Sequence, residues 1–146
     1  MKKVKDVLNA KAHAEILSAR PNTLVWDAIK LMSDNGIGAL VVTDDGHLVG
    51  IISERDYLRK VALMGRSSRS TEVREIMTAN PFTVTAEESM EACMELMTNK
   101  RIRHLPVMEG EVLIGLVSIG DILRNTMEEQ KHLIDQLEGY IRGETY

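Results

Sequence analysis

The sequence His47-Leu48-Val49-Gly50-Ile51-Ile52-Ser53-Glu54-Arg55-Asp56 has a second copy, Val112-Leu113-Ile114-Gly115-Leu116-Val117-Ser118-Ile119-Gly120-Asp121. Each copy is an apolar run that contains one glycine and is followed by a serine, two variable residues and an aspartate. Corresponding residues, such as Ser53 and Ser118, are 65 positions apart. Such apolar runs are typical of strands, and a serine with an acid three residues later is typical of a helix start. The sequence therefore predicts two copies of one small module in which a strand leads into a helix.

The composition restricts the class of protein. The chain has 146 residues, of which 44% are hydrophobic and 27% charged, as is typical of a soluble globular protein. Its net charge of −4 gives no bulk attraction for nucleic acid or for an acidic membrane, and an aromatic share of 3% leaves few rings for stacking on bases. We therefore expect neither nucleic acid nor a membrane as a partner. A single cysteine, with no apolar stretch behind Met1 long enough for a signal peptide, predicts a cytoplasmic protein.

Hydrophobic periodicity predicts the same elements in each copy, namely a strand, a helix, two strands and a second helix. In the first copy these elements cover 16–19, 23–35, 38–43, 47–52 and 54–64. In the second copy they cover 82–85, 87–100, 104–108, 112–117 and a helix from 119 onward. Thr85 and Glu88 have the spacing of a capping box for the helix at 87–100. The expected fold class is α/β (α+β), with two β-α-β-β-α repeats and an extended C-terminal helix.

These elements divide the chain into three parts. Residues 1–70 form the first repeat with its lead-in and linker, 71–126 the second repeat, and 127–146 a helical extension. The extension carries an apolar stripe at helical spacing, made of Met127, Leu133, Ile134, Leu137, Tyr140 and Ile141. We expect this stripe to pack on a partner subunit, which would make the protein a homodimer. The alternative is that the helix packs back on its own chain.

The duplicated unit resembles a tandem pair of cystathionine-β-synthase (CBS) domains, also called a Bateman module. Three features carry the resemblance: Ile76-Met77-Thr78 at the start of a repeat, Arg103-His104-Leu105-Pro106-Val107 at a strand, and the two Ser-x-x-Asp endings. The resemblance implies a pseudo-twofold pair with two clefts for adenosine-containing ligands such as AMP, ATP, NAD or S-adenosylmethionine. Such modules usually regulate another protein, here an unknown one, and do not catalyse. The first copy departs from the pattern, with Gly38-Ala39-Leu40-Val41-Val42 at the corresponding strand.

The Ser-x-x-Asp endings are the candidate ribose and phosphate sites. Asp56 and Asp121 each lie one turn into a predicted helix, where a carboxylate can accept both ribose hydroxyls. Ser53 and Ser118, with the free N–H groups of the helix start, suit a phosphate oxygen. The same spacing is also a capping box, which any helix start can use, and the two roles can coexist.

Further candidates surround these motifs. For phosphate we consider Arg55, Arg103, His104 and, in a linker that either closes over the ligand or stays a solvated connector, Arg66. For the base we consider the backbone of Ser18, Ala19, Thr83 and Val84, as in the family, together with Pro106 and Ile119. For the apolar candidates ordinary core packing is the alternative.

Two other classes of function are weighed against a nucleotide sensor. The first is a structural or adaptor dimer whose clefts hold no ligand, in which the aspartates only cap helices. The second is catalysis, for which the chain shows no nucleophile–base pair and no histidine or cysteine at metal-ligand spacing. Cys93 lies on the apolar face of a predicted helix, where we expect a buried core residue. We therefore expect no enzyme, no metal and no catalytic cofactor.

Overall fold

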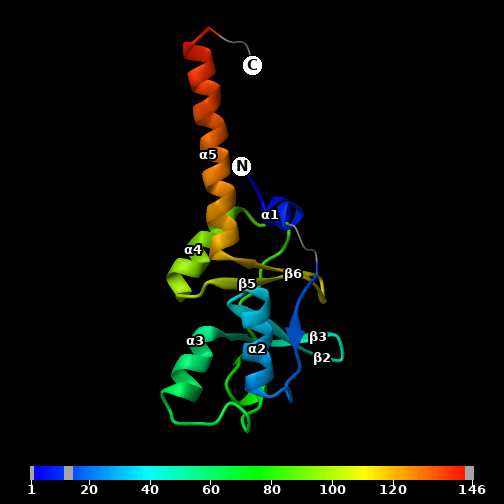
Figure 1. Cartoon of the computed structure of the whole chain (residues 1–146). Coiled ribbons are helices and arrows are strands. Elements are labelled where there is room, and N and C mark those ends of the chain that lie inside the picture. The colour runs from blue at the N-terminus through cyan, green and yellow to red at the C-terminus, as the bar shows by residue number, and fades with distance from the viewer. Residues whose placement is uncertain (1, 12–14, 144–146) are drawn as a thin grey trace.

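The computed structural model describes residues 2–11 and 15–143. Figure 1 shows two mixed halves, one above the other, with a long C-terminal helix projecting from the upper half. This arrangement confirms the expected fold class of two similar α/β repeats with an extended last helix.

The first half follows the predicted element order. It contains β1 (Ser18–Ala19), α2 (Val25–Asn35), β2 (Ala39–Asp44), β3 (His47–Ser53) and α3 (Glu54–Tyr57). The helix expected at 54–64 changes at Leu58–Ala62 into a π-helix. With β4 (Thr78–Ala79), the strands form one sheet in the order β1-β2-β3-β4, in which β1 is parallel to β2 and the other pairs are antiparallel.

The second half repeats this plan with α4 (Met90–Lys100), the antiparallel pair β5 (His104–Glu109) and β6 (Val112–Ser118), and α5 (Ile119–Ile141). The strand expected at 82–85 is reduced to one parallel bridge between Val84 and Val107. The predicted capping box of Thr85 and Glu88 is wrong. Helix α4 begins later, and Ser89 is its N-cap, accepting a hydrogen bond of 3.1 Å from the Ala92 N–H. A serine nearer the helix start supplies the cap that the threonine would have supplied.

The two hydrophobic cores exchange their opening segments. Helix α1 (Val4–Ala10) precedes the first repeat in the chain, yet Val4 and Val7 are buried in the core of the second half. Conversely, Val73 and Ile76, at the start of the second repeat, are buried in the core of the first half. Full burial of each such aliphatic side chain contributes about 1.5–3 kcal/mol. The exchange therefore holds the two halves together through both cores.

The exchange explains the glycine in each repeated strand. A Cβ added to Gly115 in β6 would lie 2.7 Å from Cδ2 of Leu8, which crosses the strand there. A Cβ added to Gly50 in β3 would lie 2.6 Å from Sδ of Met77. Real Cβ atoms do not approach other heavy atoms so closely, so a larger residue would require the exchanged segment to shift: the Leu8 side chain at Gly115, and the Met77 side chain together with the Thr78 backbone at Gly50.

Cys93 lies on α4 in the core of the second half, as expected, and is fully buried. Burial raises the pKa of its thiol to about 11. A thiol with a raised pKa carries little thiolate at neutral pH, so this residue serves packing.

Candidate functional site

The first Ser-x-x-Asp motif forms the junction of β3 and α3. Oδ2 of Asp56 accepts hydrogen bonds from the Ser53 N–H at 2.9 Å and the Ser53 hydroxyl at 3.1 Å. The Asp56 N–H donates in return to the Ser53 hydroxyl at 3.3 Å. This reciprocal pair is a capping box, so the capping interpretation of the spacing is confirmed. Oδ1 takes no part in the capping box and pairs with Lys60 Nζ at 3.2 Å.

The second motif repeats this geometry at the junction of β6 and α5. Oδ2 of Asp121 accepts from the Ser118 N–H at 2.9 Å, and the Asp121 N–H donates to the Ser118 hydroxyl at 3.1 Å. Lys11 Nζ also lies 2.9 Å from Oδ2 of Asp121, and Arg124 Nη2 lies 3.4 Å from Oδ1. Asp121 therefore caps the helix through Oδ2, and its Oδ1 has only a long contact with a surface arginine.

Both aspartates are largely shielded from solvent, with side-chain exposures of 14% for Asp56 and 13% for Asp121. Burial alone would raise the pKa of the Asp121 carboxyl. Hydrogen bonds from Ser118 and Lys11 outweigh burial, so the pKa of Asp121 lies below its usual value. The second motif therefore keeps a charged carboxylate at neutral pH in a partly desolvated position.

His104, at the start of β5, lies where the two halves meet. A Cβ added to Gly38 would be 2.9 Å from Glu54 Oε1 and 3.5 Å from His104 Cε1, so the first half contacts the imidazole there. Burial lowers the pKa of His104; the negative charge of Asp121 opposes this shift, whereas Lys11 and Arg103 reinforce it. His104, Asp121, Lys11 and Arg103 thus form one cluster beside the first half.

Gly38 in the first copy corresponds to Arg103 in the second, and its surroundings are shared between the two halves. A Cβ at position 38 would require the flexible end of the Glu54 side chain to move and would lie in ordinary van der Waals contact with His104. The Gly38 carbonyl accepts the Glu54 N–H at 3.0 Å, just as the Arg103 carbonyl accepts the Ile119 N–H at 2.8 Å. The backbone role is the same in both repeats, and at position 38 a side chain would have to share the space with Glu54 and His104.

Arg55 also bridges the halves. Its Nη1 donates to the carbonyl of Arg101 at 3.3 Å. Arg55, next to Asp56, therefore extends toward the segment that leads into Arg103 and His104, and Arg103 itself is exposed. The structure brings these phosphate candidates to one junction.

Arg66 is held elsewhere. Its Nη2 pairs with Glu75 Oε1 at 2.6 Å. The surrounding linker packs on the start of α2, where the carbonyls of Ser68 and Thr71 accept the N–H groups of Trp26 and Val25 at 3.0 and 2.8 Å. The linker thus accepts the first N–H groups of α2, while most of its side chains are exposed; closure over a phosphate stays a prediction.

The base candidates lie on edge segments. Ser18 and Ala19 form β1 at the edge of the four-stranded sheet, and Ala19 is buried. In the second half, the N–H and carbonyl of Val84 are both bonded to β5, at 3.0 and 2.8 Å. Successive residues of a strand direct their N–H and carbonyl groups to opposite sides. The N–H and carbonyl of Thr83, which is exposed, therefore point away from β5, whereas those of Val84 are used within the sheet. Pro106 is buried, and Ile119 packs against the core of the second half. Both therefore have the packing role that the sequence left open as the alternative to contact with a base.

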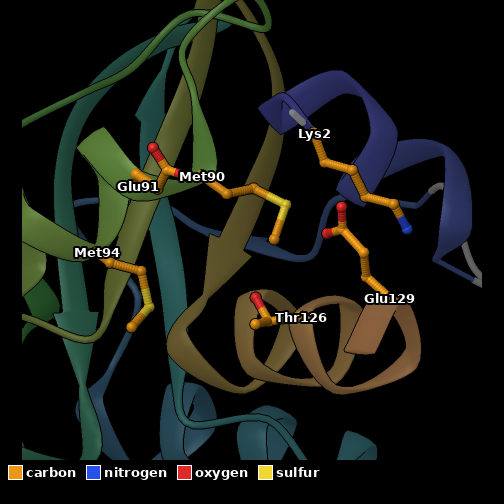
Figure 2. A pocket seen from close by; sticks show the side chains of 6 residues that line it. All are labelled: Lys2, Met90, Glu91, Met94, Thr126 and Glu129. Carbon is orange, nitrogen blue, oxygen red and sulfur yellow. The ribbon is translucent and has the colours of Figure 1, made fainter. Parts of the chain in front are cut away.

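A separate hollow lies at the base of α5. Figure 2 shows it between the segment before α1, helix α4 and α5, with Lys2 and Glu129 on one side and Met90 and Met94 on the other. Its volume is about 350 Å³. One lysine and the two carboxylates of Glu91 and Glu129 line it, so it is electrostatically unsuited to a phosphate.

Sequence reasoning missed the lysines on the two aspartates. Lys60 lies four residues after Asp56, which is the spacing of a helical ion pair and could have been found. Lys11 lies far from Asp121 in the sequence, and no local pattern predicts this contact. Among the described residues, no group of three His, Cys, Asp or Glu side chains could hold a metal ion.

The chain matches the CBS domain profile over residues 4–63 and 73–128, one match for each repeat. It is 43% identical to the mitochondrial CBS domain-containing protein CBSX3 of Arabidopsis thaliana, over 96% of this chain and 72% of that protein. Among solved structures, it is similar to a protein with CBS domains from Burkholderia ambifaria, with 48% identity, a TM-score of 0.86, and coverage of 88% of this chain and 96% of that one. A hexameric CBS-CP12 protein from bloom-forming cyanobacteria is 30% identical with a TM-score of 0.74, covering 83% of this chain and 70% of that one.

The fold and the two repeated motifs define a tandem CBS pair. The chain belongs to the CBS domain family, which confirms the resemblance found in the sequence. CBS pairs are generally regulatory, nucleotide-binding modules, and proteins made only of CBS domains are generally not catalytic. No helix in the described part of the chain has the length and apolar character needed to cross a membrane. The cytoplasmic location stays a prediction, since the Arabidopsis relative is named as mitochondrial.

Proposed function

We propose that this chain is a regulatory module that binds an adenosine-containing nucleotide, such as AMP, ATP or NAD, at its two Ser-x-x-Asp motifs. The observation that carries the proposal is the shared geometry of the two aspartates. In each motif Oδ2 is fixed by the serine at the helix start, and Oδ1 points away from the capping box toward a surface cation. Two equally positioned carboxylate oxygens are suited to receive the hydroxyls of two ribose rings.

The ribose would bind by replacing the weaker contacts of Oδ1. Lys60 is 3.2 Å from Asp56 Oδ1 and Arg124 is 3.4 Å from Asp121 Oδ1. Both cations are exposed, at 47% and 66% of their side chains, and surface ion pairs contribute little. A hydroxyl that donates to a desolvated carboxylate forms a stronger, charge-assisted bond. The capping bonds through Oδ2 stay in place, so ribose binding and capping coexist.

The cationic groups at the junction are proposed to receive the phosphates. Arg103 and Arg55 offer guanidinium groups, and Lys11 and His104 lie beside Asp121. These groups come from both halves and from the segment after α1, so a bound phosphate would draw the halves together. That change supplies the regulatory signal to an unidentified protein. We place the module in a homodimer; the hexameric CBS-CP12 neighbour supports self-association in general.

Isothermal titration of the full chain with AMP, ATP and NAD tests the proposal. We expect saturable binding that weakens at least tenfold in Asp121→Asn, since a hydrogen bond to a charged group contributes about 1.5–3 kcal/mol. Asn keeps a side-chain oxygen for the cap, so the variant should fold. Absence of binding for all three nucleotides at millimolar concentration would overturn the proposal. The competing explanation, an adaptor dimer whose aspartates act only as caps, predicts that result.

A further inference from the structure

Helix α5 leaves its own body after its first two turns. Ile122 and Asn125 are buried at the base of the helix. Beyond them, large apolar side chains are exposed, with values of 67% for Met127, 54% for Ile134, 55% for Leu137 and 83% for Ile141. Figure 1 shows this part of α5 projecting away from both halves. The apolar stripe expected from the sequence is therefore present, and within the described residues it does not pack back on its own chain.

The exposed residues follow a heptad pattern. Met127, Ile134 and Ile141 occupy the first position of successive heptads, a, and Gln130 and Leu137 occupy the fourth, d. Leu133 and Tyr140 lie at g and are also exposed, at 56% and 80%. The e positions, on the other side of this seam, are Lys131 and Glu138. A seam flanked by apolar residues on one side and by residues of opposite charge on the other is suited to pack against another helix.

We propose that α5 pairs with α5 of a second copy of this chain in an antiparallel coiled coil. In this register Ile134 packs against the partner's Leu137, and the reverse contact follows from the twofold axis. Antiparallel helices place e beside e and g beside g. Lys131 then meets the partner's Glu138, and Leu133 meets the partner's Tyr140.

A parallel pair fits the same residues less well. There, g faces e of the partner, so Leu133 would lie against the partner's Glu138, and Lys131 against the partner's Thr126. Isoleucine at a and leucine at d are compatible with a parallel dimer, but the flanking positions would set an apolar side chain against a charge. Since flanking charges determine orientation in coiled coils, the antiparallel pair is the better match.

The antiparallel overlap also covers only the free part of the helix. Because Ile134 faces the partner's Leu137, Gln130 faces the partner's Ile141, so the paired part of the seam runs from Gln130 to Ile141 and the buried base of α5 stays outside it. The two bodies then stand at opposite ends of the pair. This surface specifies the homodimer of the proposed function but uses no residue of the candidate nucleotide site, so the two can fail independently.

Charge reversal on the full chain tests the pairing. Lys131→Glu and Glu138→Lys each place like charges together at two points, so we expect each variant to dimerise at least fivefold more weakly than the wild type in analytical ultracentrifugation. An equal mixture of the two variants, and the double variant K131E/E138K, should recover dimerisation because opposite charges meet again. Asp135→Lys, outside the seam on the same helix, is the matched control and should leave the dimer unchanged. A monomeric wild type, or single variants as tight as the wild type, would overturn the proposal.

Spin-label distances determine the orientation. Single cysteines at Glu128 and Asp135, both at the b position, are introduced with Cys93→Ser. In the antiparallel register position 128 lies 15 residues from its own copy along the pair, about 22 Å at a rise of about 1.5 Å per residue, whereas position 135 lies close to its copy. We therefore expect a distance at least about 10 Å longer for 128 than for 135. Equal distances would indicate a parallel pair and overturn the proposed orientation.

Discussion

Lys11 Nζ lies 2.9 Å from Oδ2 of Asp121 and donates a second hydrogen bond of 2.8 Å to the carbonyl of Leu116. These contacts attach the segment after α1 to the junction of β6 and α5. In the first motif the corresponding cation is Lys60, which comes from the same helical stretch as Asp56. The two repeats therefore neutralise equivalent aspartates from different parts of the chain, and only the second depends on the exchanged N-terminal segment.

Replacing Lys11 by methionine should destabilise the protein by about 1 kcal/mol at pH 7. The variant leaves the shielded carboxylate of Asp121 without its lysine partner, and Lys11, a third exposed, is only partly hydrated in the wild type. Urea unfolding gives the free energy. Lys60→Met is the matched control and should show a smaller loss, since Lys60 is more exposed.

The loss in Lys11→Met should also depend on pH. The pKa of Asp121 is lowered in the folded protein, so its contribution is present above the unfolded value of about 3.9 and is lost as the pH falls through the folded value. The wild type and Lys11→Met should therefore converge in stability as the pH falls below the unfolded value and through the lowered folded pKa of Asp121. A difference that stays constant from pH 7 down to the lowest pH at which both proteins fold would show that the ion pair is not its cause.

His104 should give the stability of the protein a second dependence on pH, caused by burial of the imidazole. Burial lowers its pKa in the folded state, so the unfolded chain binds the proton more tightly. Stability should then rise with pH from the lowered folded value up to about 6.5, the ordinary value for histidine. His104→Gln should flatten this part of the profile, measured by urea unfolding between pH 5 and 7. His47, on the exposed side of the first β-hairpin, is the control position, and His47→Gln should keep the slope.

The two strand glycines should differ in their tolerance of alanine. At Gly50 an added Cβ would meet Sδ of Met77 and also the Thr78 carbonyl, at 2.9 Å, and backbone cannot move easily. At Gly115 it would meet only the end of the Leu8 side chain. Gly50→Ala should therefore cost about 1–3 kcal/mol, a typical overpacking penalty, and Gly115→Ala less. Thermal or urea unfolding provides the comparison, and Leu8→Ala should relieve the clash in Gly115→Ala; equal losses without such relief would contradict the exchanged packing.

The sequence was sufficient for most of the helices and strands that the two repeats share and for their order, but it did not predict α1 (Val4–Ala10) or β4 (Thr78–Ala79). The apolar runs that end at Ser53 and Ser118 become β3 and β6, and the serine–aspartate spacing becomes two real capping boxes. These features were predictable because each depends on residues within a few positions of one another. The shift of the α4 cap from Thr85 to Ser89 shows the limit of local reasoning, since adjacent polar residues compete for one helix start.

The long-range relationships could not be predicted. Val4 and Val7 have the same spacing as Val73 and Ile76, but the sequence of neither segment predicts which of the two cores it is buried in. The Lys11–Asp121 pair follows from the exchange, and the proximity of His104 to Gly38 follows from how the two halves meet, so sequence reasoning missed both. It did find the candidate ribose and phosphate residues, whose roles rest on local motifs, and those roles stay predictions.

The central claim is that Asp56 and Asp121 hold ribose hydroxyls. Its most direct test is a thermodynamic cycle by isothermal titration, with AMP and its 2′,3′-dideoxy analogue against the wild type and the variant D56N/D121N. We predict that loss of the hydroxyls weakens binding to the wild type at least tenfold, while the variant binds both ligands with similar, weaker affinity. Equal affinity of the wild type for both ligands would contradict the claim.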